Sequence, residues 1–378
     1  NSLQRTTQMT NQVNKVDQVD NKTAQELKVL CWAIKDVIDQ TIVTGEDEKI
    51  TMTFFIMASW FPESFDYYPY LNITSPTAGS GKSTCLEVIG AMALNPLMAS
   101  NATPPAIFRA LARQWTTLLL DEAENFALDR GGDLVAILNS GHKAATANVI
   151  RCKEENGDYE PKTFFTGGFK VIAGLPSNMI NTLRTRSIEI IMQTKLRSQQ
   201  ITRVSKLDPA KIEDTKTRLA NLRDSREVTE QLVLVEAPDV FDNRKKDKWE
   251  ALFLIAELTG SPEKEALIEA AKRLEDEMEE LDVGIQILAD IKQVLDELNT
   301  QRIPSDHLHQ KVLELRHGEW KKYDYGRGLS KNELQKRIRT FGVRTERFKY
   351  GGKSVTGYLS SQFHDSWSRY LPEEETPE

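Results

Sequence analysis

Residues 70–84 read YLNITSPTAGSGKST. The first five are uncharged and rich in β-forming side chains, so they predict a short buried strand that ends at a Ser-Pro turn. Two closely spaced glycines then allow a tight loop, and the Lys-Ser-Thr after them predicts the start of a helix. A strand, a glycine-containing loop and a helix in this order predict an α/β fold whose loop binds a phosphate group.

This loop follows the P-loop pattern GxxxxGK[ST] with one departure, since Pro76 stands where the first glycine is usual. Its glycines let the backbone curl so that successive N–H groups point at phosphate oxygens. Lys82 is then expected to bind the β- and γ-phosphates of ATP, and the Ser83 hydroxyl a Mg²⁺ ion, which prefers oxygen ligands. The residues predicted to bind ATP are Thr77, Ala78, Gly79, Ser80, Gly81, Lys82, Ser83 and Thr84.

An acidic motif follows at a suitable distance. Residues 116–120 carry no charge and predict a buried parallel strand, and Asp121 and Glu122 come directly after it. Asp121 lies 38 residues beyond Ser83 and is expected to hold the Mg²⁺ shell. Glu122 is expected to orient or activate the attacking water. A glutamate directly after the magnesium aspartate favours an ATPase over a simple nucleoside kinase.

Two polar side chains further along the chain are candidates for the same site. Asn178 follows an apolar strand predicted at 170–175, where it could contact the γ-phosphate or the attacking water, although a Ser-Asn pair also suits a plain turn. Arg244 precedes a helix that contains Trp249, and from a helical lid it could bind the nucleotide. An ordinary surface arginine is the alternative for Arg244.

Arg184 and Arg186 stand just before a strand predicted at 187–192. Ring-forming AAA+ ATPases place an arginine before this strand and direct it at the nucleotide of the neighbouring subunit. Such an arginine stabilises the charge that develops during phosphoryl transfer. Either residue is a candidate for this catalytic role, and a surface arginine with ordinary ion pairs is the alternative for each.

A β-hairpin is predicted between the Asp-Glu motif and the next apolar strand. Residues 148–166 contain two strand-like segments around a turn-rich centre. Some ring helicases carry an inserted hairpin at this place, where it lines a central pore. Arg151, Lys153 and Lys162 are therefore candidate DNA contacts. The acidic tip weakens this interpretation, and a structural contact between subunits is the alternative.

Length and composition indicate an ordinary soluble globular protein. The chain has 378 residues, 39% of them hydrophobic and 28% charged, and 49 Lys and Arg against 56 Asp and Glu give a net charge of −7. The longest nearly apolar run, 54–61, is far shorter than the ~20 residues that cross a bilayer. Residues 1–22 lack the apolar core of a secretory signal. Three separated cysteines exclude a disulfide framework, so a cytoplasmic location without membrane contact is expected.

The charge changes sign near residue 300. Residues 263–298 carry four Lys or Arg against twelve Asp or Glu, whereas residues 302–370 carry fifteen against seven. The second segment resembles a winged helix, because a helix capped by Ser330 precedes two strands joined by a Gly-Gly turn. A basic helix beside a basic hairpin is typical of DNA-binding surfaces, with a protein-contact module as the alternative. The candidate DNA contacts in this segment are Lys331, Lys336, Arg337, Arg339, Arg344, Arg347 and Lys349.

Alternating strands and helices, followed by helices alone, predict an α/β core with a helical appendage. The expected fold is therefore α/β, an AAA+-type P-loop ATPase core with a helical lid and a C-terminal winged helix. The predicted segments are a polar N-terminal arm and helix at 1–45, the ATPase core at 46–195, the lid at 196–300, the basic winged-helix-like domain at 301–372 and an acidic tail at 373–378.

A series of segments in a constant order resembles a family of P-loop ATPases long catalogued only as a domain of unknown function. The segments are SPTAGSGKST, SNATPPAIFRAL, TTLLLDEAENF, ILNSGHKAAT, RTRSIEI, DNRKKDKWEALFLIAEL, GLSKNEL and GYLSSQFHDSWSRYLP, within residues 70–372. Members of this family occur in phages, plasmids and integrated mobile elements, often beside or fused to primase or primase-polymerase domains. The resemblance implies a helicase-like, AAA+-type replication ATPase that forms a ring. Residues 1–378 contain no primase domain, and Pro76 departs from the usual P-loop.

These observations favour an ATP-driven DNA helicase or translocase for the replication of a mobile element. ATP and Mg²⁺ would bind between the subunits of a hexameric ring. DNA is the expected substrate partner, and a primase or primase-polymerase the expected protein partner. An ATP-switched initiator, loader or regulator that does not unwind DNA is the second hypothesis, and a scaffold that contacts only proteins is the third.

Overall fold

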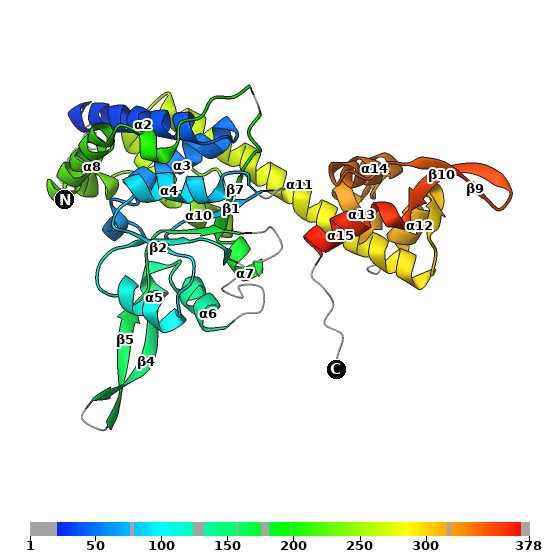
Figure 1. Ribbon diagram of the computed structural model, residues 1–378, viewed down its shortest axis with the longest axis horizontal. Coiled ribbons are helices and arrows are strands. Elements are labelled where there is room, and N and C mark those ends of the chain that lie inside the picture. Colours follow the sequence, from blue (N-terminus) through cyan, green and yellow to red (C-terminus); the bar gives the residue numbers. More distant parts are fainter. Residues whose placement is uncertain are drawn as a thin grey trace, which may run out of the picture. The chain divides into compact units, whose positions relative to one another are not determined.

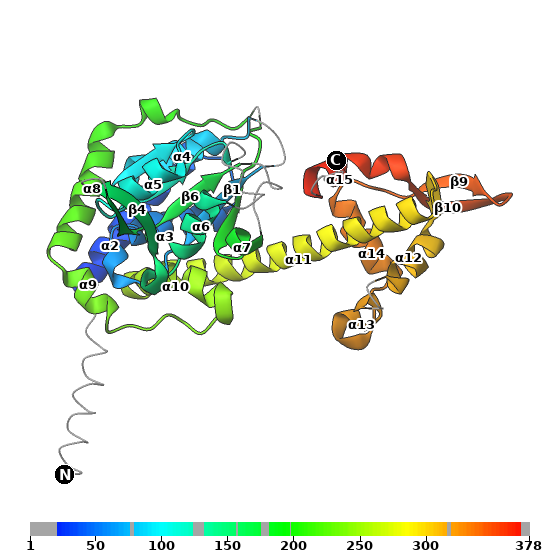
Figure 2. The ribbon, with the colours of Figure 1, turned by 90° about the horizontal axis from the view of Figure 1, so that it is seen from below.

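The computed structural model describes residues 21–75, 79–123, 132–155, 158–174, 181–196, 198–315 and 319–371. The chain divides into two compact units, Asn1–Leu274 and Glu275–Glu378, with the division inside helix α11 (Glu263–Glu297). The segment predicted as a lid, 196–300, is therefore shared between the two units. Figures 1 and 2 show the helices and strands of each unit.

Unit 1 combines helices with two sets of strands. Besides the first part of α11, its described helices are α2 (Asn21–Thr41), α3 (Glu46–Ala58), α4 (Lys82–Met92), α5 (Pro104–Leu111), α6 (Asp133–Ser140), α7 (Asn181–Arg184), α8 (Pro209–Asp224), α9 (Glu227–Leu232) and α10 (Asn243–Thr259). Its described strands are β1 (Tyr70–Thr74), β2 (Pro96–Ala99), β3 (Thr117–Leu120), β4 (Asn148–Glu155), β5 (Asp158–Phe165), β6 (Lys170–Ala173) and β7 (Ser187–Ile191).

A five-stranded parallel sheet forms the centre of unit 1, with the strand order β2-β3-β6-β1-β7. β1 lies between β6 and β7, in a register that sets Asn72 opposite both Ile172 and Glu189. β6 separates β3 from β1, with Leu120 of β3 opposite Ile172. The predicted strands agree with these bounds to within about two residues. The predicted mixed α/β fold with a parallel sheet is confirmed.

Alternate strand residues face two different hydrophobic cores, as the pleat of a strand requires. Leu71 and Ile73 of β1 belong to a core that also contains side chains of α2, α3, α4, α8, α9 and α10. Tyr70 of the same strand belongs to a second core, together with side chains of α5, α6 and α7. Figure 1 accordingly shows α2, α3 and α4 on one side of the sheet and α5 and α6 on the other. Because both faces are covered, the central strands contain few charged residues.

The helices α8, α9 and α10, which lie in the segment predicted as a lid, contribute to the first of these cores. Leu219 of α8, Val228 of α9 and Trp249 of α10 are buried there with Leu27 of α2. In Figure 2, α8 and α9 run beside α2. Residues far apart in the sequence therefore share one apolar core on the α4 side of the sheet.

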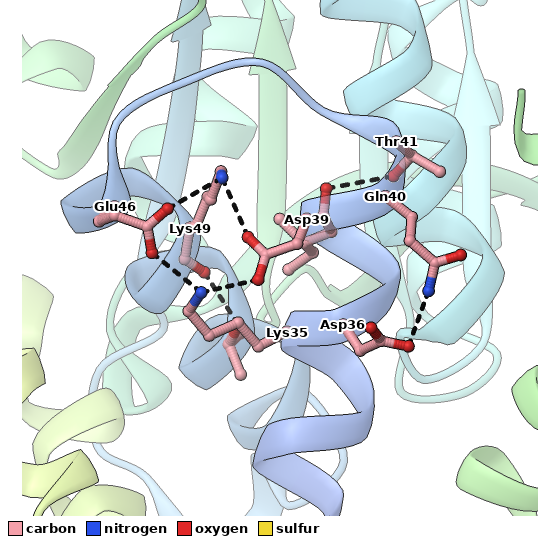
Figure 3. A network of polar contacts seen from close by, with 9 residues as sticks. Lys35, Asp36, Asp39, Gln40, Thr41, Glu46 and Lys49 are labelled. Carbon is pink, nitrogen blue, oxygen red and sulfur yellow. Dashed lines mark hydrogen bonds and ion pairs between the residues drawn. The ribbon is translucent and has the colours of Figure 1, made fainter. Parts of the chain in front are cut away.

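Four charged side chains join the end of α2 to the start of α3 (Figure 3). Lys35 contacts Asp39 at 2.8 Å and Glu46 at 2.9 Å, and Lys49 contacts the same two acids at 3.0 and 2.9 Å. Burial by itself raises the pKa of Asp39, but the two lysines bring it below its ordinary value of 3.8. Hydrogen bonds from the same lysines lower the pKa of Glu46 below 4.5. The network holds the corner between the two helices.

We expect this network to make a small, pH-dependent contribution to stability. The folded pKa values of Asp39 and Glu46 are depressed, so the contribution is complete above the unfolded values of 3.8 and 4.5 and is lost as pH falls through the lower folded values. Because the pairs are partly exposed, Lys49→Met should lower the free energy of unfolding by only about 0.5–1 kcal/mol at pH 7. Urea denaturation at pH 7 and pH 3 measures both effects. An Asp39→Asn/Glu46→Gln variant whose stability falls as steeply with pH as that of the unmodified chain would contradict the assignment.

Unit 2 packs helices against a small antiparallel sheet. Its described helices are α12 (Ser305–Glu314), α13 (Glu319–Gly326), α14 (Lys331–Thr340), α15 (His364–Tyr370) and the second part of α11. Its strands are β8 (Arg302–Pro304), β9 (Glu346–Tyr350) and β10 (Lys353–Leu359), in the order β8-β10-β9.

The core of unit 2 lies between the second part of α11 and the sheet. Ile287 and Ile291 of α11 pack there with Leu334 and Ile338 of α14 and Tyr358 of β10. The predicted cap of α14 is present, since the Ser330 hydroxyl accepts a hydrogen bond from the Glu333 N–H at 3.1 Å. Sequence patterns indicated α12, α14 and the β9–β10 hairpin but not the three-residue β8 or helix α13.

The strands β4 and β5 form the predicted hairpin outside the parallel sheet. They pair antiparallel, with Arg151 opposite Lys162. Figure 1 shows this hairpin extending away from the body of unit 1. In the described part of the chain, we find no helix whose length and hydropathy would suit a membrane span.

Candidate functional site

The carboxyl ends of the parallel strands meet at one edge of the sheet, and the predicted phosphate-binding and acidic motifs both lie there. β1 ends at Thr74 and leads into the loop before α4, while β3 ends at Leu120 and leads directly into Asp121. One strand lies between them, so the two motifs are about 10 Å apart across the sheet. In open α/β sheets, ligands bind at this carboxyl edge.

The loop before α4 has the backbone that its glycines predict. Gly79 and Gly81 adopt positive φ angles of 76° and 89°, and Gly81 is the N-cap of α4. α4 then begins at Lys82, whose Nζ donates to the Ser75 hydroxyl at 3.0 Å. Ser83 is exposed, and the first N–H groups of an α-helix have no acceptor within the helix, so the start of α4 is suited to binding a phosphate.

The acidic pair occupies the neighbouring strand end. Asp121 is half-buried, and its Oδ1 accepts a hydrogen bond from the Glu122 N–H at 3.0 Å. Glu122 is exposed and has a φ of 54°, a value that is uncommon for a residue other than glycine. The two acids thus differ in their surroundings, one half-buried and one exposed, so that each can take a different role.

The oxygen atoms of Ser83 and Asp121 fit a magnesium ion. Both belong to the donor class that Mg²⁺ prefers, and both are accessible at the same sheet edge. Within the described ranges, no group of three or more His, Cys, Asp or Glu side chains is arranged to hold a metal ion. Mg²⁺ suits such a sparse donor set, because it commonly uses one or two protein ligands and completes its shell with phosphates and water.

Three predicted residues of the nucleotide site lie outside the described residues. They are Thr77, Ala78 and Asn178. Of the other predicted ATP contacts, Ser80 is buried and lies 3.4 Å, oxygen to oxygen, from Thr194. Thr84 is half-buried in the first turn of α4.

The corner between α2 and α3 contacts this edge of the sheet. The sequence patterns did not indicate this contact. The Thr44 hydroxyl donates to the Ile191 carbonyl at 2.7 Å, and the Gln193 N–H donates to the Val43 carbonyl at 3.1 Å. The next residue, Thr194, is the one that contacts the loop residue Ser80. Tertiary contacts therefore connect residues 42–45 to the loop before α4, and only a short Ile-Val-Thr-Gly connection between two helices marks them in the sequence.

The predicted arginines lie at the opposite, amino-terminal edge of the sheet. Arg184 and Arg186 immediately precede β7, which runs parallel to β1 and spans about 15 Å. Arg244 belongs to the same group, because its guanidinium donates to the Thr185 hydroxyl at 2.9 Å. The structure thus does not bring Arg244 to Lys82 of its own chain. This position differs from the one expected for an arginine that binds the nucleotide of its own subunit.

These arginines create a strongly positive region. Arg186 donates to the backbone carbonyl of Thr182, and neither Arg186 nor Arg244 forms an ion pair with a described carboxylate. Burial and the charge of Arg244 lower the pKa of Arg186. Burial, together with the positive charges of Arg186, Lys170 and Arg244, lowers the pKa of nearby His142 to about 4. A cluster of this kind can bind an external anion.

A groove of about 580 Å³ also lies toward the amino-terminal side of the sheet, lined by Tyr68, Trp115 and Phe165 among others. It contains none of the residues predicted to bind nucleotide. The predicted phosphate-binding and acidic motifs lie instead at the carboxyl edge of the sheet, outside this groove.

The hairpin residues predicted to contact DNA differ in their surroundings. Arg151 contacts Asp133 at 3.3 Å and lies over the Phe108 ring at 5.7 Å. Lys162 is exposed on the opposite strand. The side chain of Lys153 lies outside the described part of the chain. Arg151 therefore connects the hairpin to α5 and α6, whereas Lys162 is exposed and available to a partner.

The basic residues of unit 2 also divide into two groups. Lys331 pairs with Asp306, and Arg337 contacts Glu333 at 2.8 Å and the Tyr323 hydroxyl at 3.2 Å. The second group is exposed on α14, on the connection after it and on β9, with no ion pair to a described residue. This group comprises Lys336, Arg339, Arg344, Arg347 and Lys349.

Comparisons with known proteins add a partial family match. The family described as "Protein of unknown function (DUF3631)" matches residues 192–370, which is less than half of the chain and begins beyond the P-loop. Among curated proteins, no significant match is found.

The similar solved structures are distant. One is described as "SCCmec type IV Cch - active helicase", with 14% identity, a TM-score of 0.36, and coverage of 86% of this chain and 72% of that chain. Another is described as "The A form apo structure of NrS-1 C terminal region-CTR", with 12% identity, a TM-score of 0.31, and coverage of 89% and 75%. Similarities at this level do not decide the fold or the activity of the present chain.

Proposed function

We propose that this protein is an AAA+-type ATPase that couples ATP hydrolysis to movement on DNA, as a helicase or translocase in the replication of a mobile element. The observation that carries the proposal is the pairing of two motifs at one sheet edge. A loop with two positive-φ glycines presents Lys82 at a helix N-terminus, and the Asp121-Glu122 pair ends the strand two places away.

The residues of this edge supply complementary roles for phosphoryl transfer from ATP to water. The loop N–H groups and Lys82 bind the phosphates and withdraw negative charge from them. Ser83 and Asp121 hold Mg²⁺, which neutralises phosphate charge when it is bound. Glu122 is exposed beside this position, where it can orient the attacking water and accept its proton.

The arginines at the other edge suit a ring in which each subunit completes the site of its neighbour. Within one chain Arg186 and Arg244 stand at the wrong end of β7 to reach the nucleotide held by Lys82. A head-to-tail ring would bring this positive edge to the next subunit's nucleotide. We propose a hexamer in which Arg184 or Arg186 acts as the finger, with Arg244 beside it.

DNA contacts are proposed for both units. In unit 2, the helices α12–α14 and the β9–β10 hairpin would act as a winged helix whose exposed cations bind phosphates. In unit 1, Lys162 would contact DNA from the β4–β5 hairpin. Separately, Asn178 would contact the γ-phosphate of ATP. We retain 46–195 as the ATPase core and 301–372 as the DNA-binding domain, with a primase or primase-polymerase as the protein partner.

Steady-state ATP hydrolysis with and without single-stranded DNA tests the proposal. Several-fold stimulation by single strands, followed by ATP-dependent strand displacement, would support a motor. Hydrolysis that is indifferent to single strands, combined with tight binding to a duplex site, would support an ATP-switched initiator or loader instead. The initiator or loader function is tested as well, because the exposed basic surface of unit 2 suits binding to a duplex. Absence of Mg²⁺-dependent hydrolysis would refute the proposal.

The two groups of cations in unit 2 should differ in their effect on DNA binding. Removing Arg344, Arg347 and Lys349 together should weaken binding to a duplex and lower the slope of log affinity against log salt by about 0.9 per lost phosphate contact. Lys331→Ala is the matched control, because Lys331 is already paired with Asp306 and should change the slope little. Fluorescence anisotropy over a series of salt concentrations gives the slopes. Equal slopes for the triple variant and the control would show that this surface does not bind DNA phosphates.

A further inference from the structure

Lys170 is a fully buried lysine at the first position of β6. Its Nζ donates to three backbone carbonyls, those of Gly168 at 2.9 Å, Thr166 at 3.0 Å and Gly141 at 3.5 Å. The same Nζ lies 4.7 Å from the centre of the Tyr70 ring. No described carboxylate pairs with it, and burial lowers its pKa to about 7. An apolar side chain would fill this space without the cost of burying an ammonium group.

The three carbonyls belong to segments that meet at the root of the β4–β5 hairpin. Thr166 and Gly168 lie within the three residues after β5, and Gly141 is the C-cap of α6, the helix before the hairpin. The segments are in close contact, because a Cβ at Gly141 would lie 2.4 Å from the Thr166 carbonyl oxygen and 2.9 Å from the Lys170 Nζ. Lys170 therefore fastens the hairpin exit and the end of α6 to the parallel sheet.

A second tie joins α6 to the sheet at the same place. The Tyr70 hydroxyl, on the first residue of β1, donates to the Leu138 carbonyl of α6 at 2.7 Å. β1 and β6 are adjacent strands at the centre of the sheet. Their other ends lie at the carboxyl edge, where β1 leads into the phosphate-binding loop. Each strand thus runs from the hairpin root to the nucleotide edge.

We propose that Lys170 is a positioning residue that couples the nucleotide edge of the sheet to the β4–β5 hairpin. A small shift of β1 and β6 on nucleotide binding would move the carbonyls that Lys170 holds, and with them the hairpin. The coupling element is two packed strands with a common anchor, so it can transmit a displacement over their length. This inference rests on the proposed function, because it requires that the P-loop edge binds nucleotide.

The hairpin carries a natural position for a reporter group. Cys152 on β4 is exposed, whereas Cys31 and Cys85 are buried, and burial raises the pKa of each buried thiol to about 12. A maleimide fluorophore should therefore react selectively with Cys152, and a Cys152→Ser variant checks this selectivity. The emission of the attached dye then reports on the surroundings of the hairpin.

The experiment compares the full chain with its Lys170→Met variant. The dye response on adding a non-hydrolysable ATP analogue with Mg²⁺ should fall about fivefold or more in the variant, and stimulation of ATP hydrolysis by single-stranded DNA should fall similarly. Nucleotide affinity, measured with a fluorescent ATP analogue, should change less than about twofold, because Lys170 is distant from the P-loop edge. Lys143→Met is the matched control, since Lys143 is exposed two residues after Gly141 and makes none of the three carbonyl contacts.

Each outcome decides a separate point. If Lys170→Met retains the full dye response and the full stimulation by DNA, the coupling role is wrong. If the unmodified chain binds nucleotide but its dye does not respond, the inference also fails, while the proposed function stands. If the unmodified chain does not bind nucleotide, the proposed function itself fails. Should Lys170→Met prove unfolded, Tyr70→Phe cuts only the second tie and is expected to reduce the response in the same direction; an undiminished response in Tyr70→Phe would then overturn the coupling.

Discussion

Replacing Lys82 with alanine is expected to reduce ATP turnover by about 10²–10³-fold while the chain stays folded. Lys82 is the first residue of α4, and its ammonium group is held 3.0 Å from the Ser75 hydroxyl beside the phosphate-binding loop. Removing it deletes a preorganised charge from the position where negative charge develops in phosphoryl transfer. The side chain is only half-buried and has no role in either core, so the fold should tolerate its loss.

The measurement is steady-state hydrolysis with saturating ATP and Mg²⁺, together with a thermal melt. Lys272→Ala is the matched control, because that lysine is also helical and, among the residues that the structure describes, forms an ion pair with Glu269 alone on the surface of α11. Turnover by Lys82→Ala within about tenfold of the unmodified chain would show that the loop does not perform the assigned role.

Arg186→Ala is expected to lower turnover by about 10³-fold or more without weakening nucleotide binding, provided that the arginine acts on the neighbouring subunit. The physical reason is its position at the amino-terminal edge of β7, beside Arg244 and without a described carboxylate partner. Arg244→Ala should behave in the same way. If Arg244 instead bound the nucleotide of its own subunit, its removal would weaken nucleotide affinity.

A mixing experiment separates action in the same subunit from action on a neighbour. In a randomly mixed ring of Lys82→Ala and Arg186→Ala subunits, about one quarter of the interfaces combine an intact P-loop with an intact arginine edge. Such mixtures should recover measurable activity, although each variant alone is inactive. Lys82→Ala mixed with Lys82→Met should recover none. Failure of the first mixture, with assembly verified by light scattering, would place the arginine effect within one subunit.

Arg186→Lys distinguishes a catalytic role from a structural one. Arg186 also donates to the Thr182 carbonyl, so alanine could loosen the short helix α7. Lysine keeps the positive charge but not the fork of donors that binds a phosphate oxygen in two places. We expect the lysine variant to keep the thermal stability of the unmodified chain and to remain strongly impaired in hydrolysis.

Local sequence patterns predicted the elements that depend on local chemistry. The uncharged run before the loop became β1, and the glycines before Lys82 took the left-handed backbone angles that only glycine adopts readily. The hairpin in unit 2 turns at Gly351 and Gly352, which have φ angles of 57° and 80°, as its dipeptide indicates. In each case the signal lies within a few consecutive residues.

Other features depend on contacts between residues that are far apart in the chain. The predicted lid segment divides between two units, and α2, α8 and α10 share one core. No single segment of the sequence indicates either feature. The anchor at Lys170 escaped prediction because its acceptors lie up to 29 residues away. A lone lysine in an apolar strand carries no local signal for such a role.

The position of Arg244 could not be predicted from the residues around it in the sequence. Its position before a helix was compatible with a contact to the nucleotide of its own subunit, and nothing in the neighbouring residues favoured a different edge of the sheet. The direction of β7 and a hydrogen bond to Thr185 decided its position. Motif chemistry thus follows from residue types at short spacing, which constrain the backbone directly. The edge of the sheet that a side chain reaches follows from strand order and packing, which only the folded chain determines.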